Sequence, residues 1–196
     1  MGTAASKFAA LAIALVSAAL AAGCGGARQT QGGGASGQAG FAWLSPASPP
    51  AGWQSVHIPT GATVAYPPGW TPIHGDPGTA TVALLGPKHQ IVGYLNLTPR
   101  QGAETVANYA HFRVDHNGDE GDSGIRTLAS ATNRRFGGGR ISCVQDSYAT
   151  KTGARYVELA CLVSGRSTVA VIGAAPPQSW PRVAPLLQRA ISSTTT

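Results

Sequence analysis

The chain has 196 residues, of which 11% are charged and 43% are hydrophobic, and its formal net charge is +6 at pH 7. This low charged fraction, with 26 glycines and 14 prolines, excludes a coiled coil and a highly charged disordered tail. The basic balance favours weak contact with anionic surfaces, but the sequence has no nucleic-acid recognition motif. We therefore expect no nucleic acid among the partners.

The N-terminal segment has the organisation of a bacterial lipoprotein leader. One basic residue, Lys7, precedes an apolar run over residues 8–22 that is too short to span a membrane comfortably. Small residues then lead to Cys24 in a pattern that resembles a lipobox, although Leu20 lies one position earlier than usual. We predict a signal peptide over 1–23, lipidation of Cys24 with palmitate among the acyl chains, and attachment to the extracytoplasmic side of the cell membrane. The alternative is an ordinary secreted protein in which Cys24 has no role.

The segment after Cys24 is expected to be a flexible tether. Residues 25–40 contain no apolar side chain larger than alanine, so they cannot bury enough surface to become ordered. We assign the tether to residues 24–50 and a single globular domain to residues 51–196. Phe41, Trp43 and Leu44 are too apolar for a pure spacer. They either pack on the domain, which we favour, or form a docking segment.

The two remaining cysteines, Cys143 and Cys161, lie in two alternating strands around the sequence TKTG. A three-residue loop over 151–153 would place Gly153 at the left-handed position of a bulged turn. Pairing of Thr150 with Ala154 then brings Cys143 directly opposite Cys161, within range of a disulfide bond. Because the spacing is not that of a redox CxxC motif, we predict a structural disulfide in an oxidising compartment.

The rest of the domain reads as short strands and two helices. Strand-like stretches occupy 53–59, 62–70, 79–87 and 91–99, and strands return at 125–135, at the cysteine hairpin and at 167–175. The period changes over 103–117, where Val106, Tyr109, Ala110 and Val114 share one helical face. A second apolar stripe, which includes Val183, predicts a helix over 179–193. This order predicts an α+β sandwich with helices packed on an antiparallel sheet.

Four stretches together resemble the PsbP-like lipoproteins of actinobacteria, of the LpqN and LpqT type. They are VAYPPGW, VANYAHFRV, the cysteine hairpin and the closing VAVIGAAPPQSWPRVAPLLQRAISS, and the resemblance covers about residues 51–195. It implies an α/β/α sandwich around a central antiparallel sheet. The family has no established catalytic residues to transfer to this chain, so the resemblance implies a binding or assembly module.

Two polar stretches deserve a chemical interpretation. Residues 115–122 begin like a calcium loop, but Glu120 stands where the turn needs glycine and Arg126 where the loop needs a bidentate glutamate, so we expect a solvated loop. A weak, irregular calcium site is the alternative. The second stretch, RRFGGGR, places Arg134, Arg135 and Arg140 around three glycines. We interpret it as a strand connection, with contact to an anionic lipid or wall polymer as the functional alternative.

We find no pattern of catalytic or metal-binding residues, since the five histidines are scattered and neither HExxH nor GxSxG occurs. We therefore expect no catalytic residues, no metal and no cofactor. The sequence favours a lipid-anchored, non-catalytic binding or assembly module that acts on an envelope protein partner. The alternatives are a carrier or sensor of an apolar small molecule, held between sheet and helix, and a secreted hydrolase with an unrecognised site.

Overall fold

The computed structural model describes residues 40–196. The predicted signal peptide, Cys24 and residues 24–39 of the tether lie outside the described residues. The elements in chain order are β1 (Gln54–His57), β2 (Thr63–Tyr66), β3 (Thr71–Ile73), β4 (Ala80–Leu85), β5 (Ile91–Pro99), α2 (Tyr109–Asp119), β6 (Ser123–Phe136), β7 (Gly139–Ala149), β8 (Arg155–Ser164), β9 (Thr168–Ala175) and α3 (Trp180–Ser192). No helix in this part of the chain is long and apolar enough to cross a membrane.

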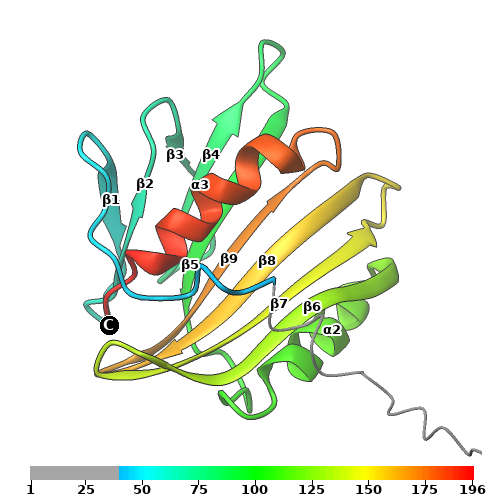
Figure 1. Ribbon diagram of the computed structural model, residues 1–196. Helices are drawn as coiled ribbons and strands as arrows, with labels where there is room; N and C mark the ends of the chain where they lie inside the picture. The colour runs from blue at the N-terminus through cyan, green and yellow to red at the C-terminus, as the bar shows by residue number, and fades with distance from the viewer. Residues whose placement is uncertain (1–39) are drawn as a thin grey trace, which may run out of the picture. The chain divides into compact units, whose positions relative to one another are not determined.

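A seven-stranded antiparallel sheet forms the centre of the domain, in the order β3-β4-β5-β9-β8-β7-β6, and β1 and β2 form a separate hairpin. Helix α3 lies across one face, over β9, β8 and β5, and it also contacts β2 (Figure 1). Helix α2 packs on the other face against β6, β7 and β8. The predicted α+β sandwich with a central antiparallel sheet is therefore confirmed.

Two apolar clusters hold these layers together because each strand alternates its side chains between the two faces. The larger cluster lies between the sheet and α3 and includes Leu95, Val171 and Leu187. The smaller one lies under α2 and includes Tyr109 and Val144. The cysteine pair belongs to the larger cluster, on the α3 side.

The hairpin of β7 and β8 has the predicted register. Thr150 and Ala154 close the loop, with the Thr150 N–H donating to the Ala154 carbonyl at 2.8 Å, and Gly153 has a φ of 82°. Cys143 pairs with Cys161 across the two strands, and the structure joins them by a disulfide bond. Both cysteines are fully buried.

The segment before Ala51 packs on the domain. Phe41 and Leu44 are buried in the larger cluster, at 1% and 8% exposure, and Trp43 packs against it. The Ala47 N–H donates to the carbonyl of Ser192 at the end of α3. Packing against the domain therefore begins before the expected boundary at Ala51, as we favoured for Phe41, Trp43 and Leu44.

Helix α2 starts later than predicted; of the predicted apolar face, Val106, Tyr109 and Ala110 do pack in the smaller cluster, but polar residues are buried beside them. It begins at Tyr109 with Asn108 as its N-cap, and in the segment before it the Glu104 carboxylate accepts hydrogen bonds from the backbone N–H groups of Gln101 and Gly102. Its buried residues are Tyr109, Arg113 and Asn117, spaced four apart, so that two polar side chains face the sheet. Apolar periodicity could not identify this face.

Candidate functional site

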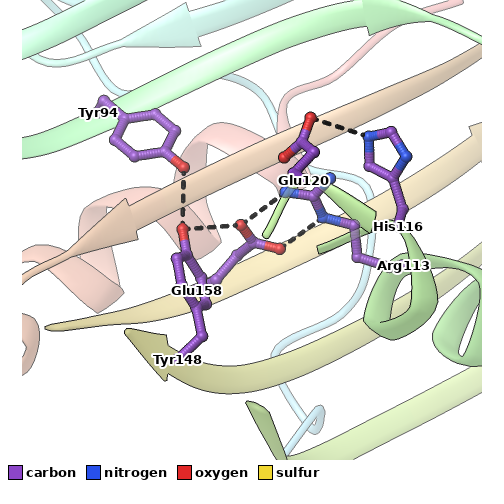
Figure 2. Close-up of polar contacts among 6 residues, drawn as sticks. All are labelled: Tyr94, Arg113, His116, Glu120, Tyr148 and Glu158. Atoms are coloured by element: carbon purple, nitrogen blue, oxygen red, sulfur yellow. Dashed lines mark hydrogen bonds and ion pairs between the residues drawn. The ribbon is translucent and has the colours of Figure 1, made fainter. Parts of the chain in front are cut away.

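The polar centre of the α2 face is an ion pair between Arg113 of α2 and Glu158 of β8 (Figure 2). Arg113 donates from Nε to Oε1 of Glu158 at 2.7 Å and from Nη2 to Oε2 at 2.9 Å. Glu158 is fully buried and Arg113 is 8% exposed. Burial acts to lower the pKa of Arg113, but the charge and hydrogen bonds of Glu158 outweigh it and raise that pKa. The guanidinium therefore stays charged and fixed.

Three tyrosines extend this ion pair across the sheet. The Tyr148 hydroxyl donates to Oε2 of Glu158, and the Tyr94 hydroxyl lies against that of Tyr148, each through a long contact of 3.5 Å (Figure 2). The ring of Tyr156 lies 6.4 Å from that of Tyr94 and 6.1 Å from that of Tyr148. Burial raises the pKa of both Tyr94 and Tyr148, so their hydroxyls stay protonated. We call Tyr94, Tyr148, Tyr156, Arg113 and Glu158 the tyrosine site.

A second carboxylate, Asp146 of β7, lies directly opposite Glu158. It is fully buried, and neither carboxylate oxygen has a hydrogen-bond partner among the described residues. Burial and the negative charge of Glu158 raise the pKa of Asp146 to about 7. Asp146 is therefore protonated at a higher pH than an exposed aspartate. Asn117 of α2 is also fully buried, and its side-chain amide has no hydrogen-bond partner within residues 40–196.

On the α2 side of the sheet, next to the tyrosine site, lies a part of the sheet that no helix among residues 40–196 covers. Helix α2 contacts β6, β7 and β8, and Ala170 and Ile172 of β9 pack in the smaller cluster beneath it, whereas β4 and β5 lie beyond the helix. The Asn96 amide there donates to Oγ1 of Thr81 at 2.8 Å. We call this surface the uncovered sheet face; its half-buried side chains are those of Thr81, Tyr94, Asn96 and Tyr156.

The predicted solvated loop over residues 115–122 is wrong, because residues 115–119 form the last turns of α2. Asp115 pairs with His111 at 2.6 Å and Glu120 with His116 at 3.2 Å, both one helical turn apart. A helix cannot wrap its carboxylates around one ion as a calcium loop does. In the described part of the chain, no three His, Cys, Asp or Glu side chains are arranged to hold a metal.

The predicted arginines lie away from the tyrosine site. Arg134 and Arg135 end β6, Arg140 begins β7, and all three are exposed beside the two-residue turn Gly137–Gly138. The interpretation of RRFGGGR as a strand connection is confirmed. Sequence reasoning missed the tyrosine site, since its residues come from three strands and a helix far apart in the chain. Its one local signal is a charged residue, Glu158, within the apolar strand YVELACLV.

No protein-family model matches the sequence, and no curated protein matches it. Solved structures do share the fold. Cyanobacterial PsbP (CyanoP) from Synechocystis sp. PCC 6803 superposes with a TM-score of 0.56 at 14% identity, over 74% of this chain and 92% of that one. The Ran-binding protein Mog1p from Saccharomyces cerevisiae gives 0.52 at 15% identity, over 73% and 94%.

LpqN, involved in cell envelope biogenesis of Mycobacterium tuberculosis, is a more distant match, with a TM-score of 0.40 and 16% identity over 73% of this chain and 89% of that one. The similarity to CyanoP and Mog1p extends over nearly the whole of each of those chains. At this identity it concerns the fold alone. The domain therefore has the PsbP-like fold.

Proposed function

We propose that this chain is a lipid-anchored, extracytoplasmic protein of the cell envelope whose domain binds a partner protein without catalysing a reaction. The observation that carries the binding role is the uncovered sheet face, where Tyr94 and Tyr156 are half-buried and each keeps part of its surface exposed. Tyrosine is enriched in protein interfaces because it offers a large contact area at low entropic cost. Tyr94 is linked through the Tyr148 hydroxyl to the Arg113–Glu158 pair, and the Tyr156 ring packs against both of the other tyrosine rings, so the site is arranged before a partner arrives.

The packing of α3 favours a protein partner over a carried apolar molecule. Val183 and Leu187 of α3 approach the sheet at Gly93 and Gly173, so closely that a Cβ on either glycine would lie within 3 Å of these side chains. Space between helix and sheet is filled by the protein's own core. The tyrosine site also suits a fixed surface better than hydrolysis, because Arg113 neutralises Glu158 and the tyrosine hydroxyls keep their protons.

The anchor and the family are part of the same proposal. The apolar run before Cys24 supports lipidation, and the Cys143–Cys161 disulfide supports an oxidising, extracytoplasmic compartment. We assign the chain to the PsbP-like lipoproteins of the LpqN and LpqT type. Mog1p, which shares the fold, is a Ran-binding protein, so the fold serves protein recognition in that case.

Site-directed photocrosslinking in the native envelope tests the binding surface. A photoreactive phenylalanine analogue is placed at Asn96 and at Tyr156, and at two exposed control positions away from this face, Thr132 of β6 and Arg182 of α3. We expect one and the same adduct from positions 96 and 156 and none from the controls. Equal adducts at all four positions, or none at 96 and 156, would contradict the proposal.

Two further measurements separate the remaining parts of the proposal. Cys24→Ala should move the protein from the detergent phase to the aqueous phase; unchanged partitioning would refute the anchor. Native mass spectrometry of the mature chain, purified gently from its own envelope, should give the mass of the protein alone. A discrete additional lipid or metabolite mass would instead favour the apolar carrier.

A further inference from the structure

Five arginines gather at one end of the sheet. The β6–β7 turn and the β8–β9 turn lie side by side there, close to the C-terminus (Figure 1), because Arg140 pairs with Ser164 across β7 and β8. The backbone N–H of Arg100, just after β5, donates to the Thr168 carbonyl at the start of β9. We call this surface the arginine end; its exposed arginines are Arg100, Arg134, Arg135, Arg140 and Arg166.

The charges of the arginine end are not compensated within the described domain. Within residues 40–196 the ion pairs are His111–Asp115, Arg113–Glu158 and His116–Glu120. None of these pairs includes any of the five arginines. Arg135 and Arg140 are direct cross-strand partners, an arrangement that like charges disfavour. A hollow of about 310 Å³ lies between them and is lined by Gly137, Gly138 and Gly139. Arg140 donates from Nη1 to the Asn133 carbonyl at 3.0 Å, and its other N–H groups and those of Arg135 form, beside exposed backbone, a surface suited to a phosphate group.

Acidic side chains concentrate at the other end. Glu120 and Asp122 follow α2 and line a hollow with Lys151 of the β7–β8 turn. Near the arginine end, Glu104 is buried and already accepts two backbone hydrogen bonds. Asp76 lies in the β3–β4 turn, toward the opposite edge of the sheet. Arg126, Lys151 and Arg155 also lie at the end that holds Glu120 and Asp122, so the arginine end is the more positive of the two ends of the sheet.

We propose that the arginine end docks on the anionic phospholipid surface of the membrane, with lipid phosphates between the arginines, and that the acidic end faces away. This inference rests on the proposed lipid anchor. The N-terminal segment passes the same end, since Pro46 lines a groove of about 850 Å³ together with Gly137 and Arg166. The chain from Cys24 to Gly40 can extend at most about 55 Å, so the anchor keeps the arginine end within reach of the lipid surface.

Because the lipid anchor already holds the protein at the membrane, a weak electrostatic contact is sufficient to orient the domain. Each basic residue near an anionic surface strengthens membrane partitioning about fivefold, and the effect falls off within a Debye length. A tether keeps the arginine end at a high effective concentration relative to the membrane surface. The lipid would thus supply attachment and the arginine end would supply orientation, leaving the uncovered sheet face accessible at the side of the domain.

Vesicle sedimentation tests the arginine end without the anchor. The mature chain with Cys24→Ser is mixed with vesicles of one part phosphatidylglycerol to two parts phosphatidylcholine, and with phosphatidylcholine alone. The test variant carries Arg134→Gln, Arg135→Gln, Arg140→Gln and Arg166→Gln. The matched control loses the same charge elsewhere, through Arg126→Gln, Lys151→Gln, Arg155→Gln and Arg182→Gln, all exposed positions.

We expect salt-sensitive binding to the anionic vesicles, a loss of at least about 100-fold in the test variant, and at most a few-fold loss in the control. Replacing the same four arginines by lysine should retain most of the binding, which separates charge from folding. Equal loss in both glutamine variants, no preference for anionic vesicles, or binding only to soluble acidic polymers would overturn the proposal. None of these outcomes bears on the Cys24→Ala partitioning, so the two proposals fail separately.

Discussion

The guanidinium of Arg113 and the carboxylate of Glu158 meet beneath α2 through two parallel hydrogen bonds, 2.7 and 2.9 Å long. Arg113→Met would leave the Glu158 carboxylate buried without a counter-charge. Removing one partner of a buried ion pair typically costs about 3–5 kcal/mol. We expect a loss of that size in the free energy of unfolding, measured by urea denaturation.

The double variant Arg113→Met/Glu158→Gln removes both charges and should regain much of this loss. Arg126→Met on the exposed edge strand β6 is the matched control and should change the stability by less than about 0.5 kcal/mol. If Arg113→Met behaved like Arg126→Met, the buried pair would have no energetic role.

The raised pKa of Asp146 predicts how the free energy of unfolding depends on pH. Burial and Glu158 raise its pKa to about 7, from the ordinary 3.8 that it regains on unfolding. Between these values the folded state binds more protons than the unfolded state, so the free energy of unfolding falls as pH rises. This contribution is fully present below pH 4 and is lost as pH rises through 7. Asp122 acts with the same sign, because burial and Glu120 raise its pKa.

Urea titrations from pH 4 to pH 8 measure this effect in the wild type and in Asp146→Asn. The amide cannot ionise, so the variant should lose most of the downward slope of stability between pH 5 and pH 8 and gain relative to the wild type at pH 8. Asp119→Asn, at an exposed position on α2, is the control and should retain the slope. A slope unchanged by Asp146→Asn would mean that another group binds the proton.

The sequence predicted the parts of the fold that local patterns encode. Alternation and turn chemistry were enough to place Cys143 opposite Cys161, since the three-residue loop fixes the register of every later pair. The apolar stripe of α3 was equally clear, and its buried residues include Val183 and Leu187. The burial of Phe41 was the favoured of two alternatives, because this residue is too apolar for a tether.

The buried face of α2 could not be predicted in the same way. Arg113 faces the sheet because it pairs with Glu158, which is 45 residues away in the chain, and no local pattern marks Asn117 as buried. Hydrophobic periodicity scores such residues as solvent-facing. The tyrosine site is likewise a product of strand order, which brings β5, β7 and β8 together only after the sheet has formed.

The disulfide predicts a measurable loss of stability. Replacing both Cys143 and Cys161 by alanine frees a loop of 18 residues in the unfolded chain, which should cost about 3 kcal/mol in the chain-entropy model. Both side chains are fully buried, so small cavities add to the loss. Urea denaturation of the wild type with and without reductant is the parallel measurement. A wild type whose midpoint does not move on reduction would contradict a stabilising bridge.

The close approach of α3 to the sheet depends on Gly173. A Cβ at this position would lie 2.5 Å from Cδ2 of Leu187, which is itself fully buried and cannot swing into solvent. Gly173→Ala should therefore destabilise the domain by about 1–3 kcal/mol through overpacking. Gly138→Ala is the control, because a Cβ there meets no atom within 4 Å. If Gly173→Ala were as stable as Gly138→Ala, there would be spare room between α3 and the sheet, and the apolar-carrier alternative would regain its physical basis.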